Sequence, residues 1–338
     1  MSEDDDAGAV PAPRETTAFY GHADAERLML AAYRAGRMPH AWLIGGEPGI
    51  GKATLAYRLA RFVLAHPDPA APAVQAAESL FVAPDHPVAR RIAARAHGDL
   101  LVLERTPGES GRLRTEIAVA DVRGTTAFFG STAGEGGWRV CIVDSADDLN
   151  RAGANALLKI LEEPPSRALL LVVSHSPARL LPTIRSRCRK LALRPLAEGD
   201  VIAAAAASLG VPETDAELRK AAALAEGSVG RAIALHDGPS LALRETVARL
   251  LAALPATDPQ ALHALGDALS RAEDALFDGF LDTVRGYLRT RLDARPDVRV
   301  ADAWDAFNRA AGDSETFNLD RKPLVFSTFA LLAEAVRH

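Results

Sequence analysis

Cysteine is nearly absent from the 338-residue sequence, which contains only Cys141 and Cys188. Two cysteines that lie far apart in apolar runs exclude a disulfide framework and a four-cysteine zinc site. No apolar run approaches the roughly 20 residues of a membrane-spanning helix, and the acidic residues 3–6 are unlike a secretion signal. We therefore expect a cytoplasmic protein with no membrane contact and no zinc.

Positive charge is also scarce, because 39 lysines and arginines are outnumbered by 44 aspartates and glutamates, which gives a formal net charge of −5. Proteins that hold nucleic acid by electrostatic attraction usually concentrate basic residues on one surface. We therefore expect any contact with DNA to be local or shared with partner subunits. The length and the 48% content of hydrophobic residues are sufficient for two or three domains with sizeable cores.

Apolar runs of strand length occur at five places before residue 195. They are separated by segments long enough for crossover helices, which is typical of a parallel sheet. Strands are predicted at 41–44, 99–104, 138–144, 168–174 and 188–193, and helices at 23–33, 52–64 and 150–163. Beyond Pro195 the strand pattern ends, and alanine- and leucine-rich helical patterns continue. The sequence therefore predicts an α/β domain with a five-stranded parallel sheet, followed by all-α regions.

The predicted domain boundaries follow composition and the glycine and proline breaks. Residues 1–17 are polar, acidic and aperiodic, which predicts a flexible arm. We assign 18–195 to the α/β domain, 196–240 to a small helical lid, and 241–338 to a helical domain that holds an oligomer together. The apolar residues of 324–332 would serve either that oligomer or the core of their own domain.

A glycine-rich loop lies between the strand predicted at 41–44 and the helix predicted at 52–64. Its sequence from Gly46 to Ala53, GEPGIGKA, fits the G-x-x-x-x-G-K spacing of a phosphate-binding loop. Gly46, Gly49 and Gly51 let the backbone curl so that its N–H groups face a polyphosphate, and Lys52 supplies a positive charge. The alternative is a glycine turn with a surface lysine, which the flanking strand and helix disfavour.

Two residues of an active nucleotide hydrolase are missing from this site. Ala53 stands where a serine or threonine hydroxyl coordinates magnesium, and Thr54 is a poor substitute because one helical position rotates a side chain by about 100°. Asp144 ends a strand and would hold magnesium through water, but Ser145 follows it where a catalytic glutamate is usual. We therefore expect ATP or ADP to be bound better than it is hydrolysed.

Other polar residues near the ends of the predicted elements are assigned no chemistry. Asp147 and Asp148 are expected to cap or solvate the next helix, for which Asn150 is the predicted N-cap. The scattered histidines show no metal-ligand spacing. No metal enzyme is predicted, and nothing in the sequence supplies the paired metal-binding carboxylates of a polymerase.

The helix predicted at 150–163 contains a run that resembles a known signature. Residues 155–165, NALLKILEEPP, are similar to the helix signature of the bacterial clamp-loader subunits gamma/tau and delta-prime, and Ser-Arg-Cys at 186–188 resembles the arginine-finger motif of that family. The resemblance implies an AAA+ P-loop fold and extends over nearly the whole chain. Because Ala53, Ser145 and the lack of cysteines between 64 and 98 depart from the gamma/tau pattern, the chain resembles the delta-prime branch.

The resemblance further implies roles for individual residues and partners. Arg187 is the expected arginine finger, which would reach the ATP site of a neighbouring subunit and stabilise charge on the transferred phosphoryl group. Ser174 corresponds to the family's sensor-one position, and Arg231 resembles the sensor-two arginine of the lid. The implied assembly is a hetero-pentamer with gamma/tau and delta subunits that opens a sliding clamp and places it on primer–template DNA.

Two alternatives stay open. One is an active AAA+ ATPase that uses Lys52, Asp144 and Asp147, with Thr54 in place of the missing hydroxyl. The other is a scaffold that neither binds nor hydrolyses nucleotide. From its sequence surroundings alone, Arg187 would be a solvated surface residue. Nucleotide binding without turnover separates the expected function from both alternatives.

Overall fold

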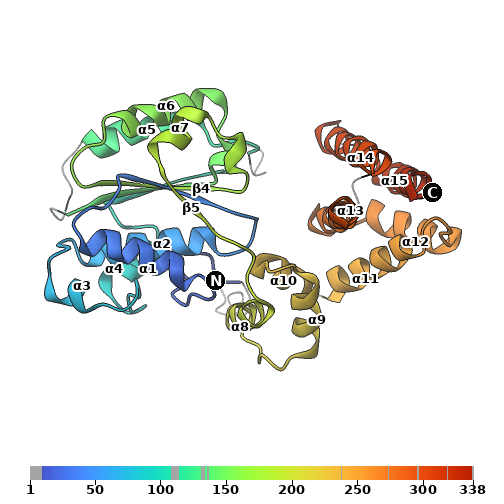
Figure 1. The fold of residues 1–338 in the computed structure, drawn as a ribbon, viewed down its shortest axis with the longest axis horizontal. Coiled ribbons are helices and arrows are strands. Elements are labelled where there is room, and N and C mark those ends of the chain that lie inside the picture. Colours follow the sequence, from blue (N-terminus) through green and yellow to red (C-terminus); the bar gives the residue numbers. More distant parts are fainter. Residues whose placement is uncertain are drawn as a thin grey trace, which may run out of the picture. The chain divides into compact units, whose positions relative to one another are not determined.

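The computed structural model describes residues 10–107, 114–130, 134, 137–236, 238–272, 274–294, 297–317 and 319–336. The chain divides into two compact units, residues 1–233 and residues 234–338 (Figure 1). The first unit contains a β-sheet with helices, and the described residues of the second form helices. In the described part of the chain, no helix combines the length and the apolar character needed to cross a membrane.

Five parallel strands form the sheet of the first unit, in the order β2-β3-β4-β1-β5. Each strand lies where an apolar run predicted it. The strands are β1 (Ala41–Gly45), β2 (Leu100–Glu104), β3 (Arg139–Asp144), β4 (Ala168–Ser174) and β5 (Arg189–Ala192). The central strands β1 and β4 are buried along their whole length. Because a strand covered on both faces needs no polar alternation, continuous apolar runs are expected at these positions.

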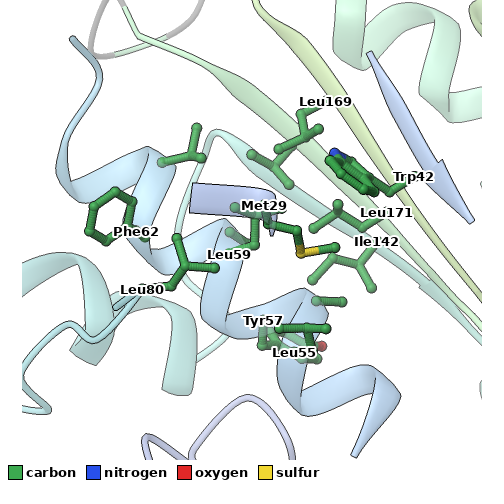
Figure 2. Close-up of a cluster of buried hydrophobic side chains, with 14 of the residues drawn as sticks. Met29, Trp42, Leu55, Tyr57, Leu59, Phe62, Leu80, Ile142, Leu169 and Leu171 are labelled. Carbon is green, nitrogen blue, oxygen red and sulfur yellow. The ribbon is translucent and has the colours of Figure 1, made fainter. Parts of the chain in front are cut away.

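Helices cover both faces of the sheet (Figure 1). One layer contains α1 (Ala23–Arg34), α2 (Lys52–Ala65), α3 (Pro72–Ala76) and α4 (Pro87–Ala93), and the other contains α5 (Val119–Gly130), α6 (Arg151–Glu162) and α7 (Pro182–Arg187). Alternate residues of β1 enter the two cores, because Trp42 and Ile44 pack with α1 and α2 whereas Leu43 packs with α6. Figure 2 shows Met29 of α1 and Leu59 of α2 in the same cluster as Trp42. The predicted α/β architecture is confirmed.

The helix that carries the family signature, α6, begins and ends where its sequence indicates. Asn150 Oδ1 accepts a hydrogen bond of 2.9 Å from the backbone N–H of Gly153, as expected of an N-cap. Leu157 is fully buried against the sheet. The helix ends at Glu162, shortly before Pro164, whose ring cannot continue a helix. Local sequence therefore determines both ends of this element.

Three further helices follow the sheet, namely α8 (Glu198–Leu209), α9 (Ala216–Leu224) and α10 (Val229–His236). They share a small, alanine-rich core of their own, which includes Val201, Ala205 and Ala222. Asp215 caps α9, since its Oδ1 accepts a hydrogen bond of 2.8 Å from the backbone N–H of Leu218. The division between the two units falls inside α10, whereas the sequence analysis placed boundaries at residues 195 and 240.

Helices and the short connections between them make up the described residues of the second unit. Its elements are α11 (Gly238–Ala252), α12 (Pro259–Ser270), α13 (Asp274–Ala294), α14 (Val298–Phe317) and α15 (Arg321–Val336). Phe280, Phe307 and Phe329 are almost fully buried in its core. Among the apolar residues of 324–332, Leu324 and Leu332 are also buried there. These side chains form the core of their own unit, which is one of the two roles considered for them.

Residues 10–17, predicted to belong to a flexible arm, pack against the α/β domain instead. Residues 1–9 of that predicted arm lie outside the described residues. Arg61 of α2 donates hydrogen bonds to the backbone carbonyls of Pro13, Arg14 and Thr16, at 3.0, 3.1 and 2.6 Å. A buried arginine distant in sequence therefore contacts a segment whose composition alone suggests a flexible arm.

Candidate nucleotide-binding site

The phosphate-binding loop follows β1 and ends at Lys52, the first residue of α2. Gly46, Gly49 and Gly51 have φ angles of 149°, 73° and 93°, in the region that favours glycine. A Cβ atom on Gly46 would lie 2.6 Å from the carbonyl oxygen of Leu193, so a side chain has no room there. The loop is therefore bent as a phosphate cradle requires, at the carboxyl end of the sheet.

A buried lysine and a half-buried aspartate lie at the inner end of this loop. Lys52 is only 3% exposed, and its Nζ donates a hydrogen bond to the backbone carbonyl of Glu47. Burial lowers the pKa of Lys52 to about 8, although the carboxylates of Asp147 and Asp144 oppose the shift. Burial and the nearby Glu104 carboxylate raise the pKa of Asp144, and Lys52 opposes them. A desolvated lysine held by a neutral carbonyl is stabilised further by an anion, so Lys52 suits a phosphate group.

The side of the loop where magnesium would be held carries few ligands. Ala53 and Thr54 line the cavity beside the loop, and Ala53 presents only a methyl group. Asp144 lines the cavity from the end of β3, and Ser145 after it is 4% exposed. Magnesium prefers octahedral coordination by oxygen atoms. The residues present therefore fit nucleotide phosphates better than they fit the metal.

Asp147 has a role that its place in the sequence did not reveal. Its Oδ1 accepts hydrogen bonds of 3.0 Å from the Ser174 hydroxyl and from the Ser176 N–H, and its Oδ2 accepts one of 2.6 Å from the His175 N–H. Burial acts to raise the pKa of Asp147, but these hydrogen bonds outweigh it and the pKa is lowered. The expectation that Asp147 caps or solvates the next helix is wrong, because it ties η1 (Ala146–Asp148) to the end of β4.

A cavity of about 480 Å³ opens beside the loop, within the first unit. Its inner end is lined by Gly49, Gly51 and Lys52. Its other walls come from residues 10–20, here called the N-terminal strap, and from Leu196, Ala204 of α8 and Ile233 of α10. A cavity with a cationic end and a mainly apolar end matches the phosphate and base halves of a nucleotide.

The lid helices contact the loop directly. The Ser228 hydroxyl donates a hydrogen bond of 2.9 Å to the carbonyl of Pro48, and the N–H of Gly230 donates one of 3.0 Å to the carbonyl of Gly49. A Cβ atom on Gly230 would lie 3.1 Å from the Cα atom of Gly49, which is tighter than an ordinary van der Waals contact, so the two segments approach closely. The start of α10 and the loop are therefore joined by backbone contacts.

The predicted binding residues fall into two groups. Those that line the cavity are Gly49, Gly51, Lys52, Ala53, Thr54 and Asp144. Gly46, Ser174 and Arg231 do not belong to its lining. Ser174 is fully buried with its hydroxyl bound to Asp147, and the Arg231 guanidinium pairs with Glu226 at 2.8 Å. The structure thus brings together the loop and Asp144, and it directs both proposed sensor side chains to partners within the chain.

Arg187 lies near the amino-terminal ends of the parallel strands, whereas the loop lies at their carboxyl-terminal ends. It ends α7 immediately before β5, and β5 runs parallel to β1 with Arg189 opposite Trp42. The loop, in contrast, leaves the carboxyl end of β1. The Arg187 guanidinium donates a hydrogen bond of 3.0 Å to the carbonyl of Thr183 and pairs with Glu162 of α6 at 2.9 Å. Its side chain is 35% exposed, so it is accessible from outside the chain.

Both cysteines are buried, and they form no ligand group. Burial raises the pKa of the Cys141 thiol to about 12 and that of the Cys188 thiol to about 11, which makes both poor nucleophiles at neutral pH. Within the described ranges, no group of three or more histidine, cysteine, aspartate or glutamate side chains is arranged to hold a metal ion.

Known proteins resemble this chain over most of its length. A family model described as DNA polymerase III, delta subunit, matches residues 21–197. A DNA polymerase III subunit delta' from Pseudomonas aeruginosa is 36% identical, over 75% of this chain and 73% of its own length. The chain belongs to the DNA polymerase III delta-prime family of clamp-loader subunits.

Two further relatives and one solved structure are similar to this chain. A subunit delta' from Escherichia coli is 34% identical over 68% of this chain and 64% of its own length. A subunit gamma/tau from Mycobacterium tuberculosis is 29% identical over 86% of this chain and 50% of its own length. A solved gamma-subunit-related protein from Thermotoga maritima aligns with 91% of this chain and with all of its own, at 19% identity and a TM-score of 0.46. The resemblance drawn from residues 155–165 is confirmed at the level of the family.

The site of this delta-prime family member includes residues that the sequence analysis did not identify. The strap lines the cavity although its composition resembles that of a free arm. Ser228 and Gly230 lie in the run 227–231 that was considered only for Arg231. Asp147 lies three residues after Asp144, but nothing local shows that the end of β4 lies beside it. The missed contacts all join segments that are distant in sequence.

Proposed function

We propose that this chain is the delta-prime subunit of a DNA polymerase III clamp loader and acts as a largely non-hydrolysing AAA+ subunit. It helps to place a sliding clamp on primed DNA during replication, and it supplies Arg187 as an arginine finger to the ATP site of a neighbouring subunit. The observation that carries the proposal is the position of Arg187, which lies at the end of the parallel strands opposite to its own phosphate-binding loop.

Arg187 is too far from its own loop to act there, because parallel strands separate the start of β5 from the end of β1. A guanidinium offers several N–H donors in a planar fork that suits phosphate oxygens. Thr183 and Glu162 each accept one of these donors, so others stay available to a phosphate of an adjoining subunit. An arginine finger that stabilises the transferred phosphoryl group raises the hydrolysis rate by roughly 10³-fold or more.

Three features of the chain's own site support weak or absent hydrolysis. Ala53 offers no hydroxyl to magnesium, and Ser145 offers no base to water. Asp147 would be the remaining candidate base, but both of its oxygens accept hydrogen bonds from the end of β4 and its pKa is lowered. A carboxylate with a low pKa and occupied lone pairs takes a proton from water poorly. The alternative of an active ATPase that uses Asp147 is therefore poorly supported.

ATP or ADP is the cofactor that the cavity fits. Gly49, Gly51 and Lys52 would hold the phosphates, and the strap, α8 and α10 would surround the base and ribose. The nucleotide would supply the negative charge that balances Lys52. A scaffold without nucleotide binding would leave this lysine, which is 3% exposed and has a pKa of about 8, with the Glu47 carbonyl and the nearby carboxylates but with no phosphate. Nucleotide binding without turnover is therefore the better-supported state.

Gamma/tau and delta subunits are the proposed partners, in a hetero-pentamer that acts on the sliding clamp and on primer–template DNA. Similarity to gamma/tau over most of the chain supports a shared assembly of related subunits. The net charge of −5 supports DNA contacts that are shared with partners. A trans-acting Arg187 also requires a neighbouring ATPase, so the proposal predicts function only in the complex.

The experiment that tests the proposal is reconstitution of the five-subunit loader with either the wild-type chain or Arg187→Ala. We expect hydrolysis at the adjoining site to slow by roughly 100-fold or more, because the charge on the transferred phosphoryl group loses its partner. Single-turnover ATP hydrolysis, stimulated by clamp and DNA, would show this as the loss of one kinetic phase. Arg179→Ala is the matched control, since Arg179 is an exposed arginine of η2 (Pro177–Arg179).

Assembly is measured for each variant by size-exclusion chromatography, so that a lost phase is not mistaken for a lost subunit. An unchanged phase in an intact Arg187→Ala complex would remove the trans-acting role. ATP turnover by the isolated wild-type chain would favour the self-contained ATPase. Failure of the isolated chain to bind ATP or ADP would favour the scaffold.

A further inference from the structure

Two buried arginines of α2 have no part in holding phosphate. Arg61 is 2% exposed and Arg58 is 7% exposed, and they lie on the helix that begins with Lys52. Burial, together with repulsion from Arg58, lowers the pKa of Arg61 to about 10, so Arg61 stays charged at neutral pH. A buried charge needs hydrogen-bond partners of good geometry. For Arg61 these partners come from the N-terminal strap, and for Arg58 they come from the strap and from Glu26 of α1.

Arg61 binds the strap through three backbone carbonyls. One terminal nitrogen, Nη2, donates to the carbonyls of Pro13, Arg14 and Thr16 at 3.0, 3.1 and 2.6 Å. A turn brings these carbonyls together, since the N–H groups of Glu15 and Thr16 donate to the carbonyl of Ala12 at 2.8 and 3.0 Å. The strap therefore folds around the Arg61 guanidinium, with three of its carbonyls directed at this group.

Arg58 holds the next part of the strap. Its Nη1 donates to the carbonyl of Thr17, and its Nε donates to Glu26 Oε1 of α1 at 2.6 Å. The same carboxylate oxygen accepts a hydrogen bond of 2.7 Å from the N–H of Leu80. The Arg58 guanidinium also lies 5.7 Å from the ring centre of Phe19. The strap is thus fixed at consecutive positions by two arginines one helical turn apart.

The strap continues from these arginines to the phosphate-binding loop. A Cβ atom on Gly51 would lie 3.8 Å from the Phe19 ring, so the two residues are in ordinary contact. His22, just after the strap, donates from Nε2 to the carbonyl of Ile50 at 2.9 Å, because a carbonyl only accepts. Neither Arg58 nor Arg61 lines the cavity, whereas most residues of the strap do. The arginines therefore act on the cavity only through the strap.

We propose that Arg61, supported by Arg58, is a positioning residue that holds the N-terminal strap as the base-side wall of the nucleotide cavity. The wall depends on contacts of the protein alone, and the phosphate loop does not require Arg61. Loss of Arg61 should consequently weaken the binding of the base and ribose while leaving the binding of the phosphates unchanged. The inference rests on the proposed binding of ATP or ADP for its ligand, but the strap contacts stand independently of it.

The test compares two probes on the full chain by calorimetry, ATP and inorganic tripolyphosphate. Arg61→Met should lower the affinity for ATP about tenfold, because a preorganised wall is lost. It should leave the affinity for tripolyphosphate within about twofold, since the glycines and Lys52 are unchanged. Arg61→Lys should give an intermediate loss, because it keeps the charge and several donors without the planar fork. Arg34→Met is the matched control, as Arg34 also donates to a backbone carbonyl, that of Val74, at 2.9 Å.

Hydrogen exchange of residues 10–20 supplies a readout that needs no ligand. In Arg61→Met these amides should exchange at least roughly tenfold faster, and in Arg34→Met they should match the wild type. Equal weakening of both probes would overturn the proposal, because Arg61 would then support the fold or the loop. Faster exchange with unchanged ATP affinity would also overturn it. If the wild type binds no ATP, the proposed nucleotide site fails, and unchanged strap exchange in Arg61→Met would separately overturn the role of Arg61.

Discussion

The two ends of the parallel sheet differ in what they retain of phosphoryl-transfer chemistry. At the carboxyl end, the loop and Lys52 are present, but Ala53 and Ser145 replace the groups that would hold magnesium and activate water. At the amino end, Arg187 keeps an exposed guanidinium. Because β1 and β5 are parallel, the length of the strands separates these two sets of residues. Under the proposed function, one chain would lose its own hydrolysis while it keeps an arginine for the ATP site of a neighbouring subunit.

The difference between the two ends should change most when a metal ligand is restored at the carboxyl end. In Ala53→Thr, we expect the affinity for ATP in the presence of magnesium to rise about tenfold, because a hydroxyl at this position coordinates the metal. We expect no turnover, since Ser145 still offers no base. Calorimetry with magnesium or with EDTA measures the first effect, and phosphate release measures the second.

Ala53→Val is the control for this substitution, because valine has nearly the shape of threonine without its hydroxyl. The gain should be absent from Ala53→Val and should vanish in EDTA. An equal gain with valine would show a packing effect. Turnover by Ala53→Thr alone would contradict the assignment of Asp147, because that carboxylate would then have to act as the base despite its hydrogen bonds to the end of β4.

The charge of Lys52 makes the carboxyl end sensitive to pH. Burial brings its pKa from 10.5 down to about 8, so the free chain loses this positive charge as the pH rises through 8. Between pH 7 and pH 9 the charged fraction falls from about 0.9 to about 0.1, and the affinity for ATP without magnesium should fall about tenfold. Lys52→Arg, which stays charged, should bind equally at both pH values. A flat wild-type profile would place the lysine pKa well above 9.

The elements of the fold were predictable because their signals are local. Continuous apolar runs identified the five strands, and Asn150 with Pro164 bounded α6. The loop glycines were predictable for the same reason, since their spacing specifies a bent backbone. In contrast, the hydrogen bonds between Asp147 and the end of β4 depend on strand order, which brings residues 147 and 174 together. A prediction from sequence alone would have needed that order before it could assign Asp147.

The strap shows a second limit of local reasoning. Its prolines and polar residues suggest disorder, and that inference holds for a segment without partners. Here the partners are Arg58 and Arg61, which a helical pattern would place on α2 as ordinary charged residues. Their burial follows only when the strap covers them, so neither segment reveals the contact by itself. Buried arginines facing backbone carbonyls are therefore a signal that appears only in three dimensions.

A smaller effect at the amino end would show whether the proposed arginine finger is oriented by its own chain. Glu162, near the end of the family signature, pairs with Arg187 at 2.9 Å, and the two side chains are 49% and 35% exposed. Because exposed ion pairs are weak, Glu162→Gln should slow hydrolysis at the adjoining site only about threefold, with no change in the KM for ATP. Glu163→Gln removes the same charge one position along and serves as the control. Equal effects of the two substitutions would indicate a general change in surface charge, whereas an effect confined to Glu162 would mean that α6 orients the guanidinium at the end of α7.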